Sequence, residues 1–175
     1  MSEEDYIFTT PVEKYKDTYI EGIKDFQKEG IRYLNEDVND LQNNFNNYLD
    51  KWNRDSEGVN LAHDRVPQTV YWLIVNNVYV GRVSIRHTLN DHLLKVGGHI
   101  GYDIIPSERK KGYGTALLKF ALIKAKEFGI DKALLTCDED NIGSRKIIEG
   151  AGGILENIIE GENNEPNKCR FWIQI

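Results

Sequence analysis

The chain has 175 residues, of which 40% are hydrophobic and 29% are charged, and its formal net charge is −6. This size and composition indicate one globular domain and exclude a disordered polypeptide, while the acidic balance argues against nonspecific nucleic-acid binding. No apolar stretch approaches the roughly 18 residues that a membrane span requires. The acidic N-terminus lacks the pattern of a secretory signal, and the two cysteines, Cys137 and Cys169, suit reduced thiols, so we expect a cytoplasmic protein.

The first third of the chain predicts a helical arm that follows a short strand at residues 5–8. A first helix is expected to begin with Thr10 as its N-cap and Glu13 completing a capping box, and to end at Gly30. A second helix is expected over residues 36–52, because apolar residues recur there at helical spacing.

The rest of the chain predicts strands interleaved with helices. Two strands at residues 69–75 and 78–85 form a hairpin around Asn76-Asn77. The later elements, in chain order, are a strand at 99–105, a helix at 115–128, a strand at 133–137, a helix at 141–151, and strands at 154–159 and 170–175. The expected fold class is therefore mixed α/β, with a mostly antiparallel central sheet flanked by helices. Its order is strand, two helices, three strands, helix, strand, helix, two strands.

The segment from residue 102 to residue 115 carries the clearest chemical signal. It passes from a strand, through a loop that contains two glycines, into the N-terminus of the strongest predicted helix. Backbone N–H groups are unsatisfied at a helix start, and the helix dipole favours negative charge there. Arg109, Lys110 and Lys111 bring three positive charges to the same place. The segment therefore predicts a binding site for a pyrophosphate group.

Two nucleotide-binding patterns fail on specific residues. A P-loop needs a lysine and a serine or threonine after its last glycine, where this sequence has Thr115 and Ala116. A Rossmann fingerprint needs a small residue at Leu117 and a parallel sheet, which the hairpin at Asn76-Asn77 contradicts.

The spacing Arg109-x-x-Gly112-x-Gly114 resembles the Arg/Gln-x-x-Gly-x-Gly/Ala pattern of the GNAT superfamily, the acetyl-CoA-dependent N-acetyltransferases. The order of elements also resembles the fold of that family. Residues 137–144 are similar to its strand end, its asparagine and its short helix. The resemblance is strongest from residue 69 to residue 155, and it implies acetyl-CoA as co-substrate.

The resemblance also implies how the chain is divided. It implies one N-acetyltransferase domain over residues 1–175, made of a helical substrate-side arm (1–66), an acetyl-CoA-binding core (67–160) and a C-terminal turn and strand (161–175). In the family, the strand that corresponds to Tyr102–Ile104 splays from its neighbour, its backbone pairs with the pantetheine arm, and an N–H near Ile104 polarises the acetyl carbonyl. The cofactor-binding residues implied in this way are Tyr102, Asp103, Ile104, Arg109, Lys110, Lys111, Gly112, Tyr113, Gly114, Thr115, Asn141 and Ser144. No metal site is expected.

His99 and Tyr102 are the candidate catalytic residues. His99 titrates near neutral pH and is a possible proton acceptor, but strand alternation favours a structural histidine that points away from the site. Many members of the family place a tyrosine seven residues after the asparagine, where it protonates the departing thiolate, and this sequence has Ile148 there. Tyr102, Tyr113 or a water molecule would have to replace that acid.

Two functions stay open at this point: an active N-acetyltransferase that acts on a small molecule or peptide, and a catalytically weak CoA-binding sensor or regulatory module. The acceptor amine is unidentified. The acidic residues Glu36, Asp37 and Asp40 suggest a cationic acceptor, although they could equally do no more than favour the dipole of the helix that follows them. We expect no nucleic-acid or membrane partner, and a monomer or homodimer.

Overall fold

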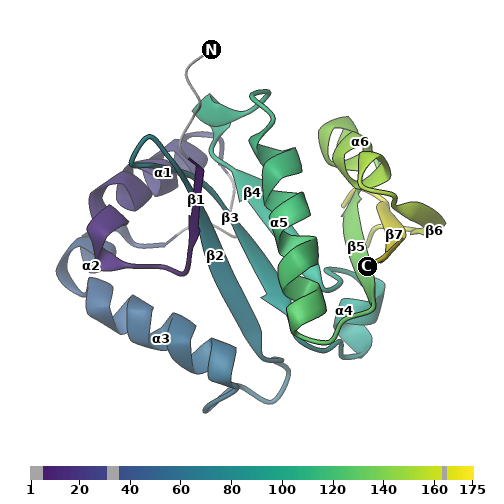
Figure 1. Ribbon diagram of the computed structural model, residues 1–175, viewed down its shortest axis with the longest axis horizontal. Helices are drawn as coiled ribbons and strands as arrows, with labels where there is room; N and C mark the ends of the chain where they lie inside the picture. The colour runs from purple at the N-terminus through teal and green to yellow at the C-terminus, as the bar shows by residue number, and fades with distance from the viewer. Residues whose placement is uncertain (1–5, 31–35, 163–164) are drawn as a thin grey trace.

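The computed structural model describes residues 6–30, 36–162 and 165–175 and contains two antiparallel sheets (Figure 1). The strands of the first sheet, in spatial order, are β1 (Tyr6–Thr9), β2 (Gln68–Val75), β3 (Val78–Arg86) and β4 (Ile100–Ile104). Those of the second are β5 (Lys132–Asp138), β7 (Lys168–Gln174) and β6 (Ile154–Ile159). The predicted fold class is confirmed, with the difference that the central sheet is divided in two.

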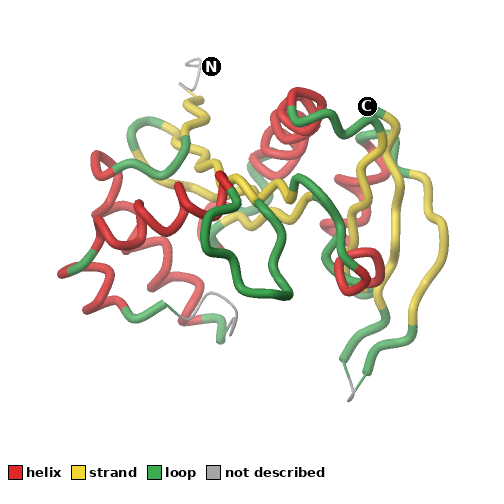
Figure 2. The backbone as a smooth tube through the Cα atoms, turned by 90° about the horizontal axis from the view of Figure 1, so that it is seen from below, coloured by secondary structure: helices red, strands yellow, loops and turns green. Residues whose placement is uncertain are grey.

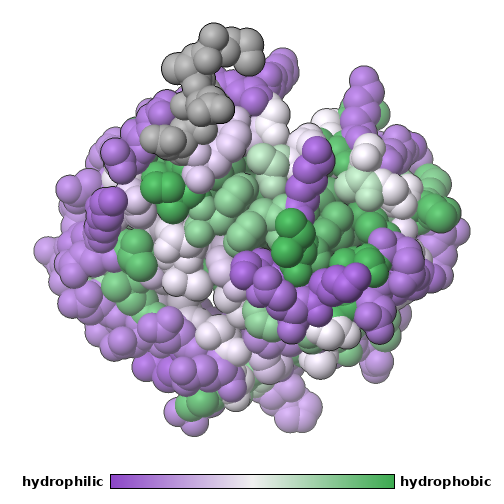
Figure 3. Space-filling model, in the orientation of Figure 1, coloured by the Kyte–Doolittle hydropathy of each residue, from purple (hydrophilic) through white to green (hydrophobic). Residues whose placement is uncertain are grey.

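Helices cover both faces of the first sheet. The helices on one face are α1 (Lys16–Lys28), α2 (Val38–Asn43) and α3 (Phe45–Glu57), and those beyond the other face are α5 (Tyr113–Glu127) and α6 (Ile142–Gly150). Figure 2 shows the first three helices at one end of the molecule and the second sheet at the opposite end. On the face seen in Figure 3, hydrophilic side chains dominate the side of α2 and α3, and hydrophobic ones gather towards β1 and α5.

The strand β2 is buried on both faces because its side chains alternate between two cores. Trp72 and Ile74 pack beneath α1 and α3, where Trp72 stacks on Tyr19 with ring centroids 4.5 Å apart. Leu73 and Val75 face the core beneath α5. This double burial explains why the strand has no polar face in the sequence.

The predicted hairpin is confirmed at Asn76 and Asn77, which both have positive φ angles, of 50° and 64°. Two consecutive left-handed residues make the tight turn that matches the twist of paired strands, and asparagine tolerates that conformation. The elements after the hairpin also lie where they were predicted, and the structure adds a short helix that was not predicted, α4 (Asp91–Lys95).

The arm differs from the prediction in two places. Thr10 does not cap the first helix: Val12 remains extended, and a 3-10 turn at Glu13–Tyr15 leads into α1. The predicted helix at 36–52 is two helices, because the chain leaves helical geometry at Asn44. Just before it, the Asn43 side chain donates to the Asn39 carbonyl (2.9 Å), and such side chain-to-backbone bonds compete with the helix ladder. The first strand is confirmed at Tyr6–Thr9, while residue 5 lies outside the described residues.

The strands β4 and β5 are joined at one end and then diverge. An isolated bridge links Gly98 to Leu135, and the His99 N–H donates to the Leu134 carbonyl (2.7 Å). Beyond this point the described parts of β4 and β5 belong to different sheets. The splay that the family resemblance implied is therefore present, and it separates the two halves of the molecule around one hydrogen-bonded junction.

We expect Gly98→Ala to destabilise the protein by about 2–4 kcal/mol. Gly98 has a φ of 61°, and a Cβ atom there would overlap the Leu134 carbonyl, so the substitution would add backbone strain and push the two sheets apart. Gly150→Ala is the matched control, since its Cβ meets no atom within 4 Å, and it should change the unfolding free energy by less than about 1 kcal/mol. Urea denaturation measures both, and equal stabilities for the two variants would contradict the prediction.

Candidate functional site

A cavity of about 650 Å³ lies where the two sheets diverge, between β4 and the N-termini of α5 and α6. Its lining residues are Glu29, Tyr102, Asp103, Ile104, Glu108, Arg109, Lys110, Gly112, Tyr113, Gly114, Thr115, Asn141, Gly143, Ser144 and Ile147. The structure thus brings together every predicted cofactor-binding residue except Lys111, although Tyr102 and Asn141 are far apart in the sequence.

One wall of the cavity is the edge of β4 that does not pair with β3. Ile105 donates to the Val80 carbonyl (3.0 Å), and the His99 carbonyl accepts from Arg86 (2.8 Å). Because ladder bonds alternate along an antiparallel pair, these two bonds place the N–H and C=O groups of Tyr102 and Ile104 on the opposite side of the strand. We call these backbone groups of Tyr102 and Ile104 the exposed edge of β4.

The N-terminus of α5 forms a second wall. Gly112 is its N-cap, in a left-handed conformation with a φ of 87°, and no side chain caps the helix. The first-turn N–H groups of a helix have no partner within the helix, so the positive end of the α5 dipole is open to the cavity. A Cβ atom at Gly114 would lie 2.8 Å from Ile147 Cδ1 and 3.7 Å from Tyr102 Cε2. The cavity therefore depends on the absence of a side chain at this position.

The positive charge of the loop is smaller than the sequence suggests. The Arg109 guanidinium forms an ion pair with Glu29 (2.9 Å), and Lys111 forms one with Glu108 (2.7 Å). Lys110 lines the cavity and forms no ion pair with any other residue that the structure describes. Anion binding here would depend on backbone N–H groups as much as on side-chain charge.

The third wall is the start of α6. The Asn141 side chain accepts from the Ser144 N–H (3.0 Å) and so caps α6, while Asn141 also lines the cavity. The Ser144 hydroxyl is hydrogen-bonded to the Tyr102 hydroxyl (3.1 Å), which ties α6 to β4 across the gap. Burial raises the pKa of Tyr102 to about 12, and the bond to Ser144 lowers it only in part. Tyr102 therefore stays protonated through the neutral and moderately alkaline range.

The structure does not bring His99 to this cavity. Its Nδ1 accepts the Leu134 N–H (3.0 Å) at the junction of the two sheets, and its ring lies edge-on to Trp172. Burial, together with the charge of Arg86, lowers the pKa of His99. An imidazole whose Nδ1 accepts a backbone bond carries its proton on Nε2. This geometry agrees with the structural histidine that the sequence favoured.

Four residues that line the cavity were not predicted from the sequence: Glu29, Glu108, Gly143 and Ile147. Ile147 could have been predicted from the sequence, because it lies three residues after Ser144 on the same face of a predicted helix. Glu29 was not, since it ends α1 and no local pattern connects it with a loop 80 positions later.

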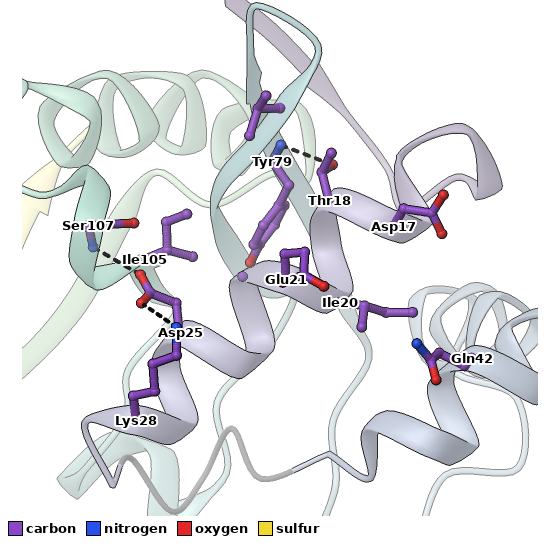
Figure 4. Close-up of a pocket in the computed structure, with 12 residues that line it drawn as sticks. Asp17, Thr18, Ile20, Glu21, Asp25, Lys28, Gln42, Tyr79, Ile105 and Ser107 are labelled. Carbon is purple, nitrogen blue, oxygen red and sulfur yellow. Dashed lines mark hydrogen bonds and ion pairs between the residues drawn. The ribbon is translucent and has the colours of Figure 1, made fainter.

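A second cavity, of about 680 Å³, lies between α1, the start of β3 and the loop after β4 (Figure 4). Its charged residues are three carboxylates and one amine, Asp17, Glu21, Asp25 and Lys28. Asp25 Oδ2 accepts the Ser107 N–H (3.0 Å), which lowers the pKa of Asp25. None of the predicted site residues lines it, and its negative charge does not suit a phosphate ligand.

Other kinds of site find no support in the part of the chain that the structure describes. No group of three or more histidine, cysteine, aspartate or glutamate side chains could hold a metal ion in residues 6–30, 36–162 and 165–175. Within the same ranges, no helix has the length and apolar character needed to cross a membrane.

Solved structures share this fold at low sequence identity. The microcin C7 self-immunity acetyltransferase MccE, in complex with acetyl-CoA and AMP, is 17% identical, with a TM-score of 0.70 over 99% of this chain and 94% of that one. The ribosomal L7/L12 α-N-protein acetyltransferase RimL, in complex with coenzyme A, is 14% identical, with a TM-score of 0.69 over 97% and 94%. An N-acetyltransferase from Staphylococcus aureus Mu50 is 11% identical, with a TM-score of 0.66 over 97% and 98%.

The family itself is identified by sequence. A search of curated protein sequences gives no match. The model of the Acetyltransferase (GNAT) domain family, in contrast, matches residues 24–154, which is most of the chain and includes β4, the glycine loop, α5 and α6. The chain therefore belongs to the GNAT family of acetyltransferases.

Proposed function

We propose that this protein transfers an acetyl group directly from acetyl-CoA to an amine of a small molecule or peptide. One observation carries the proposal: the exposed edge of β4 and the uncapped N-terminus of α5 open into the same cavity. The first offers N–H donors to a thioester carbonyl and the second suits a pyrophosphate. Membership of the GNAT family supports acetyl-CoA as co-substrate, as do the complexes of MccE with acetyl-CoA and of RimL with coenzyme A.

The residues of the cavity fit the parts of that ligand. The N–H groups of the α5 N-terminus and the Lys110 ammonium would hold the pyrophosphate, where the missing Cβ of Gly114 leaves the space. The exposed edge of β4 would pair with the amides of the pantetheine arm, and Asn141 and Ser144 would line its channel. Acetyl-CoA would supply an activated acetyl group and a thiolate leaving group.

The chain's own groups then have two tasks. The Ile104 N–H would stabilise the oxyanion that develops as the neutral amine attacks. The acceptor ammonium must first lose a proton, whereas a thiol, with a pKa near 8.5, leaves without full protonation. Ile148, a buried apolar residue of α6, cannot donate a proton, and the high pKa of Tyr102 makes its hydroxyl a weak acid.

A cationic acceptor remains part of the proposal, on different residues from those first suggested. Asp37 caps α2, Asp40 accepts from the Tyr48 hydroxyl (2.7 Å), and Glu36 accepts from that of Tyr19 (3.3 Å). These bonds favour a structural role for all three carboxylates. Asp103 lines the cavity beside the exposed edge of β4, and its carboxylate lies 3.5 Å from the Arg82 guanidinium, so a cationic acceptor would share it with Arg82.

Other parts of the proposal stay predictions. They are the division into an arm (1–66), a cofactor-binding core (67–160) and a C-terminal segment (161–175), the cytoplasmic location, and a monomeric or homodimeric state.

A thiol-release assay with acetyl-CoA and a panel of amines tests the proposal. We expect release that depends on both acetyl-CoA and an amine. The alternative, a CoA-binding sensor, is favoured by Ile148 and by the absence of a histidine from the residues described around the cavity. Binding of CoA without thiol release from any amine would support the sensor and contradict the enzyme.

Gly114→Trp should abolish CoA binding, because the indole would fill the space between α5, Ile147 and Tyr102. Gly150→Trp adds the same bulk to α6 where a Cβ meets no atom within 4 Å, and it should bind CoA like the wild type. Calorimetry measures both, after circular dichroism has shown that each variant is folded. Unchanged CoA affinity in folded Gly114→Trp would place the cofactor elsewhere.

The specificity constant should rise with pH through the neutral range, as more of the acceptor amine is deprotonated. It should show no fall near pH 10 from Tyr102, because burial holds the pKa of that phenol at about 12. The Tyr102 phenol therefore keeps its proton well above the pH at which an ordinary tyrosine ionises. The pH profile of Tyr102→Phe should have the same shape as that of the wild type, with Tyr113→Phe measured in parallel. An alkaline decline that either substitution removes would show that this tyrosine is the acid.

A further inference from the structure

The Arg109 side chain is engaged on two sides within the cavity. Its Nη1 donates to Glu29 Oε1 (3.0 Å) and lies 2.9 Å from Oε2, and its Nε donates to the Ile104 carbonyl (3.2 Å). The first bond neutralises the guanidinium. The second occupies a carbonyl on the exposed edge of β4. The cofactor would need both the charge of the Arg109 guanidinium and the Ile104 carbonyl.

The position of Glu29 beside this loop is fixed by the fold. Glu29 is the C-cap residue of α1, and one turn earlier Asp25 accepts the Ser107 N–H (3.0 Å), as the dashed line in Figure 4 shows. The end of α1 is therefore attached to the loop at two points, Ser107 and Arg109. Glu29 itself lines the cavity.

The ion pair is suited to exchange. The Glu29 and Arg109 side chains are 41% and 42% exposed, and pairs with that exposure are weak. A guanidinium binds phosphate oxygens most strongly through two parallel hydrogen bonds, whereas Arg109 contacts the Glu29 carboxylate with Nη1 alone. A carboxylate next to the phosphates also repels them. Glu29 thus competes with the pyrophosphate for Arg109 and opposes its charge.

We propose that Glu29 is a positioning residue that holds Arg109 on the exposed edge of β4 until the pyrophosphate of the cofactor replaces it. This inference rests on the proposed function, because it requires that the cavity bind acetyl-CoA. The exchange frees the Ile104 carbonyl for the pantetheine arm and releases the end of α1 from the loop at Arg109. Glu29 therefore lowers cofactor affinity and connects the arm with occupancy of the cofactor site.

Calorimetry with CoA tests the exchange on Glu29→Gln. We expect the variant to bind CoA about two to five times more tightly than the wild type, the range that a weak exposed ion pair allows. Glu21→Gln is the matched control: it removes the same charge from α1, and its carboxylate pairs with Lys24 (2.7 Å) rather than with the loop. CoA affinity should not change in the control. Thermal unfolding verifies that both variants are folded.

Two further measurements separate exchange from a purely structural effect. In an Arg109→Gln background, Glu29→Gln should give a smaller gain in CoA affinity, because the part of the gain that acts through Arg109 is lost. Glu29→Gln should also change the KM for acetyl-pantetheine less than it changes CoA affinity, because acetyl-pantetheine has no pyrophosphate to bind Arg109. Equal or weaker CoA binding by Glu29→Gln, or a gain of undiminished size without Arg109, would overturn the exchange while leaving the proposed function intact. A wild-type protein that binds no CoA would instead overturn the proposed function, and the exchange with it.

Discussion

Among the described residues, the hydrogen bonds between the two sheets lie at one end, and the cavity beside β4 exists because of that arrangement. At the junction, Leu134 accepts from the His99 backbone and donates to the His99 ring. The hydrophobic core beneath α5 is nevertheless continuous, since Val83 of β3, Leu135 of β5 and Phe171 of β7 share it. The helix therefore holds both sheets at a fixed separation while β4 and β5 diverge. A strand edge is left facing a cavity inside the molecule.

Such an edge requires partners. Buried backbone N–H and C=O groups are costly when they have none. The Ile104 carbonyl is satisfied by Arg109, and the other groups of the exposed edge open into the cavity. A ligand that carries amides in a chain, as pantetheine does, can satisfy them in the way a neighbouring strand would. Binding specificity of this kind comes from strand geometry, so side chains along β4 can vary as long as the divergence is kept.

The sequence predicted the elements that local chemistry determines. Asn76-Asn77, the glycines around α5 and the alternation in β2 all act over a few residues, and the corresponding elements are confirmed. The arm was harder to predict, because the apolar spacing continues past Asn44, where the backbone leaves helical geometry. The glycine loop before α5 was recognisable from its spacing. Its charge balance was not, since Glu29 reaches Arg109 from another element.

Electrostatics in this acidic chain act over short distances. The net charge of −6 would repel a phosphate ligand at long range. Salt confines that repulsion to about 8–10 Å, so the N-terminus of α5 and Lys110 can still present a local positive potential.

The acidity of the groups around the cavity also depends on their immediate surroundings. The environment that buries Tyr102 against Ser144 raises the pKa of its phenol, and the tyrosine thereby becomes a structural link between β4 and α6 rather than a ready acid. With Ile148 apolar as well, the demanding proton transfer in the proposed reaction would be the loss of a proton from the incoming amine.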